Sequence, residues 1–396
     1  AGAAVEADAA PQPAEELLLS PGHARLALWA VGLSGLCALA LEVLWTRSLV
    51  YYLDNSTHAF TTMLTAFLLG IGLGSALIAR FIDGRKSPLA LFGAIEVLIG
   101  VSALLAIPIL AHSTPVMSQM IEARIGPMLH WRWAGLRFVT SLSVMLVPTV
   151  LMGMTVPLVV KVYTRSLDRL GTSLGRVYFV NTTGGVLGSV LAGFVLIPLV
   201  GVQHGIVVAS VLSMALGVAL FLVEPALRGR TVAKGAFGLV TLATGAAALW
   251  AAHDPLVLTS FKERVDEGEV LFYDEGVGST VKVFQSQAGD KFVSIDGFPV
   301  AGTSLDMLDA QQTLGNIPML LSDVPGARVN LIGFGAGGAS WEVLQYDVSE
   351  VHTVELVPGV LRAAKWFPEI NHDVLSQPRF RAILNDGRNY ALVSRE

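Results

Sequence analysis

The stretch 328–346, RVNLIGFGAGGASWEVLQY, decides the fold of the C-terminal part of the chain. A short apolar segment ends at Ile332 and is followed by Gly333, Gly335, Gly337 and Gly338, which satisfy both GxGxG and GxGxxG. Glycine has no Cβ, so a chain can turn sharply there and its backbone can approach a ligand closely. The stretch predicts a strand, a ligand-binding turn and a helix; the alternative is a tight strand-to-helix turn that binds nothing.

Two further strands are expected downstream of this turn. EVHTVELVPGVLRAAKWF (350–367) reads as a strand and a helix, and FRAILNDGRNYALV (380–393) as a third strand with a polar turn. Glu355 ends the second strand, 22 residues after Gly333, a spacing that suits a carboxylate accepting hydrogen bonds from ribose hydroxyls. Asp386 ends the third strand, where a polar side chain could meet an adenine edge. The order of these elements predicts a nucleoside site in a partial Rossmann-like α/β domain.

A small β-domain is expected just upstream. Residues 269–299 alternate as strands do, and Thr280–Gln285 and Lys291–Ile295 are separated by Ser-Gln-Ala-Gly-Asp, which indicates a hairpin. A helix is expected from Leu305 to Leu321. We therefore predict a small β-hairpin domain over 254–304 and the partial Rossmann-like domain over 305–396.

The first 250 residues have a different composition. The whole chain is 53% apolar and only 14% charged, with a mean hydropathy of +0.62, and ordinary soluble domains are about one quarter charged. Long apolar runs occupy residues 25–253, after a polar tail over 1–24 that we expect to be disordered. Backbone amides in lipid must be bonded internally, so the runs should be helices. The fold class expected here is a multi-span α-helical membrane bundle of about seven helices: 26–50, 58–80, 88–111, 134–160, 177–200, 202–223 and 232–252.

Glycine pairs and a few polar residues stand out within these runs. Small-xxx-small pairs such as Gly70/Gly74 and Gly184/Gly188 favour close helix packing over a flexible transport helix.

Ionisable groups at membrane depth are costly unless they are paired, so Glu42, Arg47 and Glu96, together with Asn181, are functional candidates. Glu42 and Arg47 are five residues apart and do not stack on one helix face. Each is expected to pair with another helix or to reach the interface. A transporter usually has a denser polar pathway, which makes transport the weakest of the functions considered.

Charge predicts an orientation. With the N-terminus inside, eleven basic residues lie in the inside connections: Arg25, Arg80, Arg85, Lys86, Lys161, Arg165, Arg169, Arg176, Arg228, Arg230 and Lys234. Three lie on the other side: Arg124, Arg132 and Arg137. Seven spans then place everything after Trp250 outside the cytoplasm. An eighth span, or a re-entrant segment near Met117–Leu129, would reverse this.

Other ligand classes find little support. No dense basic patch with interleaved aromatic residues is present, which argues against nucleic acid as a partner. Cys37 is the only cysteine, and the eight histidines show neither HxxxH nor HExxH spacing, so no disulfide and no metal site are predicted.

Four segments carry a resemblance to a known family. IDGFPVAGTSLDMLDAQQTLGNIPMLL (295–321), VNLIGFGAGGASWEVLQYDVSEVHTVELVPGVLRAA (329–364) and DVLSQPRFRAILNDGRNYAL (373–392) resemble successive blocks of the spermidine synthase family. They are closest in type to its bacterial membrane-fused members, to which GLSGLCALALEVLWTRSL (32–49) is also similar. The resemblance implies a multi-pass protein of the bacterial inner membrane with an aminopropyltransferase-like domain.

The same resemblance assigns site residues. The ligand would be decarboxylated S-adenosylmethionine or S-adenosylmethionine. Gly333, Gly335 and Gly337 would line its nucleoside-amino acid part. Glu355 would hold the ribose, Asp386 would lie on the adenine side, and Gln311 would lie near the aminopropyl donor.

Departures from the family pattern shape the functional expectation. Ala336 stands where soluble members have an acid, and Glu355-Leu356-Val357 stands where they have Glu-x-Asp. The family's catalytic aspartate follows a further strand, beyond Glu396, so no catalytic residue is predicted in this chain. Adenosyl ligands are expected to bind weakly or not at all.

Without that further strand, the strand Val329–Gly333 would present an open edge, which another protein chain is expected to cover. The sequence thus predicts a spermidine synthase-like subunit or scaffold of a membrane complex with a remnant nucleoside site. The alternatives are an active membrane-bound aminopropyltransferase, if the chain is a fragment, and a transporter.

Overall fold

The computed structural model describes residues 20–53, 57–82, 87–122, 130–164, 170–252, 268–322 and 324–394. The predicted tail over 1–24 lies mostly outside these residues, but its last part is ordered, because the first helix begins at Pro21. The start of the predicted β-domain, 254–267, also lies outside them.

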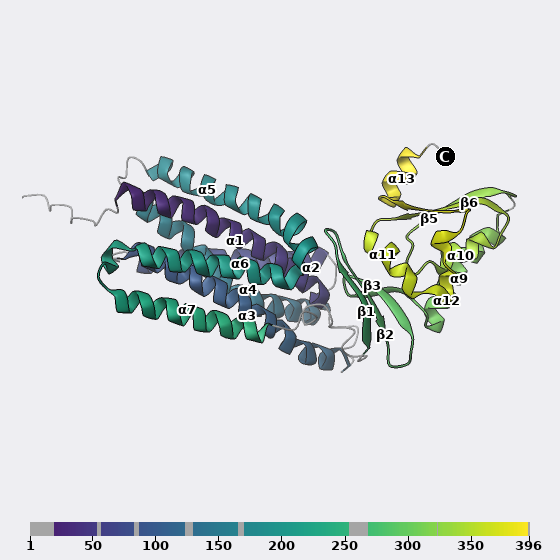
Figure 1. Ribbon diagram of the computed structural model, residues 1–396, viewed down its shortest axis with the longest axis horizontal. Coiled ribbons are helices and arrows are strands. Elements are labelled where there is room, and N and C mark those ends of the chain that lie inside the picture. Colours follow the sequence, from purple (N-terminus) through teal and green to yellow (C-terminus); the bar gives the residue numbers. More distant parts are fainter. Residues whose placement is uncertain are drawn as a thin grey trace, which may run out of the picture.

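Long apolar helices form the N-terminal part of the molecule (Figure 1). They are α1 (Pro21–Leu53), α2 (Thr57–Phe81), α3 (Pro88–Glu122), α4 (His130–Tyr163), α5 (Leu170–Leu191), α6 (Ile197–Val223) and α7 (Thr231–Ala251), with a π-helical turn over Ala192–Leu196. Within the described residues, six segments are long and apolar enough to cross a membrane. One of them, Leu170–Val223, has 54 residues and contains both α5 and α6.

Gly201 breaks this long segment. A straight helix of its length would extend about 80 Å, far beyond the roughly 30 Å of a hydrocarbon core. Gly201 has φ 81° and ψ 168°, outside the helical region, and the two arms both pack against α1. The predicted boundary between the fifth and sixth spans falls at this residue. The bundle of apolar helices is confirmed, while the count of seven crossings stays a prediction.

The glycine pairs lie where helices approach closely. A Cβ on Gly70 or Gly74 of α2 would overlap α4, and a Cβ on Gly184 or Gly188 of α5 would overlap the backbone of α1. Glu96 of α3 is also a packing residue. Its side chain is completely buried, and Oε2 accepts a hydrogen bond of 2.8 Å from Ser213 of α6. This contact joins α3 to α6, while Oε1 of the same carboxyl group is buried and has no hydrogen-bond partner among the described residues.

An antiparallel sheet follows the bundle. Its strands, β1 (Glu269–Glu275), β2 (Thr280–Gln285), β3 (Lys291–Ile295) and β4 (Phe298–Gly302), pair in sequence order. The expected hairpin is β2–β3, with the bounds predicted from the sequence. Asp296 and Gly297, with φ of 50° and 83°, form the tight turn between β3 and β4, as Asp-Gly pairs commonly do in hairpins.

A parallel sheet with helices forms the C-terminal part. Its elements are α9 (Leu305–Leu320), β5 (Ala327–Ile332), α10 (Gly338–Leu344), β6 (Val348–Glu355), α11 (Pro358–Ala363), α12 (Pro368–Asn371), β7 (Phe380–Leu384) and α13 (Gly387–Val393). The strand order is β5-β6-β7, all parallel. Side chains from both sheets and the intervening helices share one apolar core, which includes Val283, Val351, Val360 and Phe367. The antiparallel sheet and the parallel sheet with its helices therefore pack against each other through this core.

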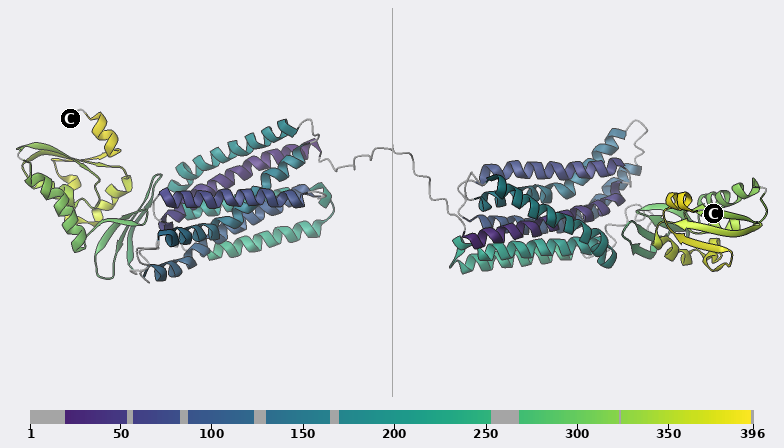
Figure 2. Two further views of the ribbon diagram at one scale, coloured as in Figure 1. Left: turned by 180° about the vertical axis from the view of Figure 1, so that it is seen from behind. Right: turned by 90° about the horizontal axis from the view of Figure 1, so that it is seen from above.

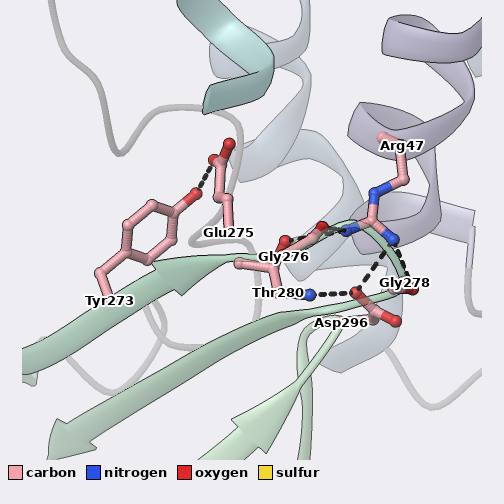
Figure 3. Close-up of polar contacts among 7 residues, drawn as sticks. All are labelled: Arg47, Tyr273, Glu275, Gly276, Gly278, Thr280 and Asp296. Carbon is pink, nitrogen blue, oxygen red and sulfur yellow. Dashed lines mark hydrogen bonds and ion pairs between the residues drawn. The ribbon is translucent and has the colours of Figure 1, made fainter. Parts of the chain in front are cut away.

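The antiparallel sheet also contacts the end of the bundle (Figures 1 and 2). Arg47 of α1 reaches into the turn between β1 and β2, where its guanidinium donates to the carbonyls of Gly278 (2.8 Å) and Gly276 (3.2 Å). Figure 3 shows this arginine beside Asp296. Of the two expectations for Arg47, the structure does not show a pairing with another helix; the side chain extends beyond the end of the bundle and binds the antiparallel sheet.

Candidate functional site

The glycine turn joins β5 to α10 at the carboxyl end of the parallel sheet. Gly333, Gly335 and Gly337 all have positive φ, at 88°, 58° and 89°. Such angles favour glycine strongly. Gly337 also lacks space, because a Cβ there would lie 2.7 Å from the ring of Phe334 and 2.9 Å from Asn371. The backbone path of the turn thus requires the glycine pattern.

Glu355 lies against this turn, at the last position of β6. Its Oε2 accepts from the backbone N–H of Phe334 and its Oε1 from that of Val357, each at 2.8 Å. The residue is only 5% exposed. Each carboxylate oxygen has a second lone pair, so the arrangement holds the turn and leaves acceptor capacity. The ribose contact stays a prediction.

Gln311 approaches the turn from α9. Its side-chain amide donates to the carbonyls of Gly302 and Met307, both at 3.0 Å. Its Oε1 is buried, has no hydrogen-bond partner in the part of the chain that the structure describes, and lies 2.9 Å from where a Cβ of Gly338 would be. Buried acceptors are nearly always paired, so this oxygen marks a place where a donor group would be stabilised.

Asp386 lies two residues beyond the end of the third strand, where the prediction had it as the last residue of that strand. β7 ends at Leu384, and Asp386 caps α13 by accepting from the N–H of Asn389 at 2.8 Å. The next residue, Gly387, packs on the side chain of Ile332, at the end of β5. The residue therefore follows the third strand instead of ending it, and it remains at the edge of the sheet where the glycine turn lies.

Asn371 was not predicted from the sequence, although its side chain binds the backbone of the glycine turn. Its Nδ2 donates to the carbonyl of Ala336 at 3.0 Å and to that of Ala364 at 2.8 Å, and the residue is 3% exposed. Ala336 itself is completely buried, so an acid could not occupy that position without moving the turn. No local sequence signal identifies Asn371, because its role depends on how α12 packs.

Two carboxyl groups of the C-terminal part of the chain have shifted pKa values. Burial raises the pKa of Asp296 above its usual value, an effect that the N–H of Thr280 and the charge of Arg47 partly oppose. The Ser304 hydroxyl lowers the pKa of the exposed Asp306, in the first turn of α9. Within the described part of the chain, no three His, Cys, Asp or Glu side chains gather into a group that could hold a metal ion.

Known proteins resemble the chain over most of its length. It is 23% identical over 365 residues to the polyamine aminopropyltransferase of Oceanobacillus iheyensis, a match that covers 89% of this chain and 65% of that protein. It is 27% identical to polyamine aminopropyltransferase 1 of Ralstonia nicotianae, covering 96% of this chain and 68% of the relative. The chain thus spans about two thirds of the length of these relatives. They confirm the resemblance to the spermidine synthase family.

Comparison of structures gives a local likeness. A crystal structure of spermidine synthase in complex with the transition-state analogue AdoDATO matches 31% of this chain and 42% of its own, at 24% identity and a TM-score of 0.29. No protein-family model matches the chain.

Proposed function

We propose that this chain is a membrane-anchored, aminopropyltransferase-like protein of a bacterial inner membrane, and that the turn Gly333–Gly337 binds the adenosyl part of decarboxylated S-adenosylmethionine. The single observation that carries the proposal is the junction of this turn with Glu355, whose carboxylate holds the N–H of Phe334 at 2.8 Å. The long relatives named above support the activity class.

The residues present fit such a ligand. Left-handed glycines remove side chains from the path of a bulky nucleoside. Glu355 has spare lone pairs for ribose hydroxyls, and the unpartnered Oε1 of Gln311 offers an acceptor for the ammonium end of an aminopropyl group. When bound, decarboxylated S-adenosylmethionine supplies a sulfonium-activated aminopropyl group. The residues described here would bind and orient it, and we assign none of them to deprotonation of the acceptor amine.

Calorimetry on the full chain in neutral detergent tests the proposal. Decarboxylated S-adenosylmethionine should bind saturably, and Glu355→Ala should weaken binding by about tenfold or more, the effect of one lost hydrogen bond to a charged group. Asp309→Ala, an acid on α9 outside the junction, is the matched control. Equal binding by wild type and Glu355→Ala, or none by either, would overturn the assignment and favour the weak binding expected from Ala336 and Leu356-Val357.

A specific observation favours a second candidate, that of a subunit in a membrane complex. In the described residues β5 is an edge strand, paired on one side only with β6, and Ile332 is 70% exposed. Exposed apolar edges favour pairing with a further strand. We propose that another polypeptide segment, from this protein or a partner, covers Val329–Gly333. Hydrogen exchange of the β5 amides in native membranes and in detergent distinguishes a covered edge from an open one.

A further inference from the structure

A cavity opens at the end of the bundle that lies away from the antiparallel sheet. Its volume is about 520 Å³, and it lies between the first turns of α1 and α5 and the last turn of α4. Figures 1 and 2 show that α1 and α5 both begin at this end of the bundle. The cavity is therefore separate from the glycine turn and from the joint that Arg47 makes.

Two guanidinium groups line this cavity, and none of the described residues that line it is acidic. Arg25 forms no hydrogen bond or ion pair within the described part of the chain, and Arg176 contacts only the hydroxyl of Tyr163, at 3.5 Å. Like charges that share one cavity repel each other in a medium of reduced dielectric constant. An anion between them would remove this repulsion and accept their hydrogen bonds.

Hydroxyl groups complete the lining. Ser173 is 7% exposed, lines the cavity, and has no hydrogen-bond partner among the described residues. Its hydroxyl group supplies a further hydrogen-bond donor for an oxygen bound in the cavity. Thr172 lies beside it. The first-turn amides of two long helices also face this end, and helix N-termini attract phosphate groups.

The neighbouring cavity indicates where such a phosphate would come from. It has about 450 Å³, lies between α4 and α5, and is lined by apolar residues that include Val160, Leu170 and Leu174, with Lys161 beside them. Tyr163 and Ser173 line the first cavity, and their chain neighbours Thr164 and Leu174 line the second. A phosphate pocket next to an apolar groove, at the end of membrane-length helices, has the chemistry of a phospholipid.

We propose that Arg25, Arg176, Tyr163 and Ser173 bind the phosphate of an anionic phospholipid, with an acyl chain along the groove between α4 and α5. The inference rests on the proposed membrane location. It does not depend on the adenosyl site. Free phosphate shares the chemistry of the headgroup, so the experiment must separate the two.

The test uses the full chain in neutral detergent, with native mass spectrometry as the readout. Phosphatidylglycerol should be retained, and equimolar inorganic phosphate should not displace it. The double variant Arg25→Gln/Arg176→Gln should bind phosphatidylglycerol about tenfold more weakly or worse. Arg228→Gln, an exposed arginine in the connection between α6 and α7 at the same end, should bind like wild type. Ser173→Val gives a second variant that keeps both charges and should also lose affinity.

Equal retention by the double variant and wild type would overturn the proposal, as would complete displacement by inorganic phosphate. Carbonate extraction of cell membranes tests the membrane location separately. If the chain resists extraction but the double variant Arg25→Gln/Arg176→Gln still binds phosphatidylglycerol like wild type, only the lipid site is rejected. If carbonate releases the chain, both the membrane location and the lipid site are rejected.

Discussion

Arg47 of α1 and Asp296 of the β3–β4 turn lie 3.9 Å apart, measured from Nη1 to Oδ1, and join the apolar bundle to the antiparallel sheet. The side chains are 17% and 9% exposed. Because the same guanidinium donates to the carbonyls of Gly276 and Gly278, the arginine fixes the orientation of the sheet as well as its position. The sheet in turn supports the glycine turn through the shared apolar core.

Arg47→Lys should loosen this joint although it keeps the charge. Lysine cannot reproduce the forked donation to two carbonyls, and the loss of hydrogen bonds from a charged donor costs about 1.5–3 kcal/mol. Spin-label distances between α7 and β2 should broaden in the variant. Arg176→Lys, at the opposite end of the bundle, is the control, and an unchanged distribution in Arg47→Lys would show that other contacts hold the sheet.

Asp296→Asn should flatten the pH dependence of stability. Burial raises the pKa of Asp296 in the folded state above its ordinary value of 3.8, so the folded protein binds the proton more tightly than the unfolded chain. The free energy of unfolding therefore falls as pH rises from 3.8 through the raised pKa, and is level above it. Asparagine keeps an acceptor for the N–H of Thr280. Denaturant titrations across this range should show the slope in wild type only; a slope that persists in the variant assigns it to another group.

Gly337→Ala should destabilise the site more than Gly333→Ala. The two glycines have nearly the same φ, 89° and 88°, but only a Cβ at Gly337 would meet neighbours, Phe334 and Asn371. Either alanine costs about 1–2 kcal/mol because its backbone is in the left-handed region. Gly337→Ala also displaces the neighbouring atoms of Phe334 and Asn371. Thermal unfolding of the two variants measures the difference. Equal losses would mean that the turn can move away from α12.

Asn371→Asp should weaken the turn without changing its shape. The carboxylate cannot donate to the carbonyls of Ala336 and Ala364, and we expect a loss of about 1–3 kcal/mol for the unsatisfied buried groups. Binding of decarboxylated S-adenosylmethionine should weaken in parallel. Asn389→Asp, on exposed α13, is the control; a variant at Asn371 that unfolds like wild type would remove the role given to this residue.

Local patterns predicted the elements well and the contacts between them poorly. The bounds of β2 and β3, the end of β6 at Glu355 and the break near Gly201 follow from alternation, spacing and turn residues, which act over a few neighbours. Arg47 and Asn371 could not be placed in this way, because their partners lie far along the chain. Asp386 was misplaced by two residues, since a helix cap and a strand end look alike in sequence.

The break at Gly201 has a consequence for the order in which the protein is assembled. The amide of Val202, freed by the break, is capped by the carboxylate of Glu275, a residue that the ribosome adds 73 positions later. Until Glu275 has been added, the amide at this break inside α6 lacks the carboxylate that accepts its hydrogen bond in the folded chain. The helices are therefore synthesised before the residue that caps the break in α6, and this cap forms only when β1 has been made.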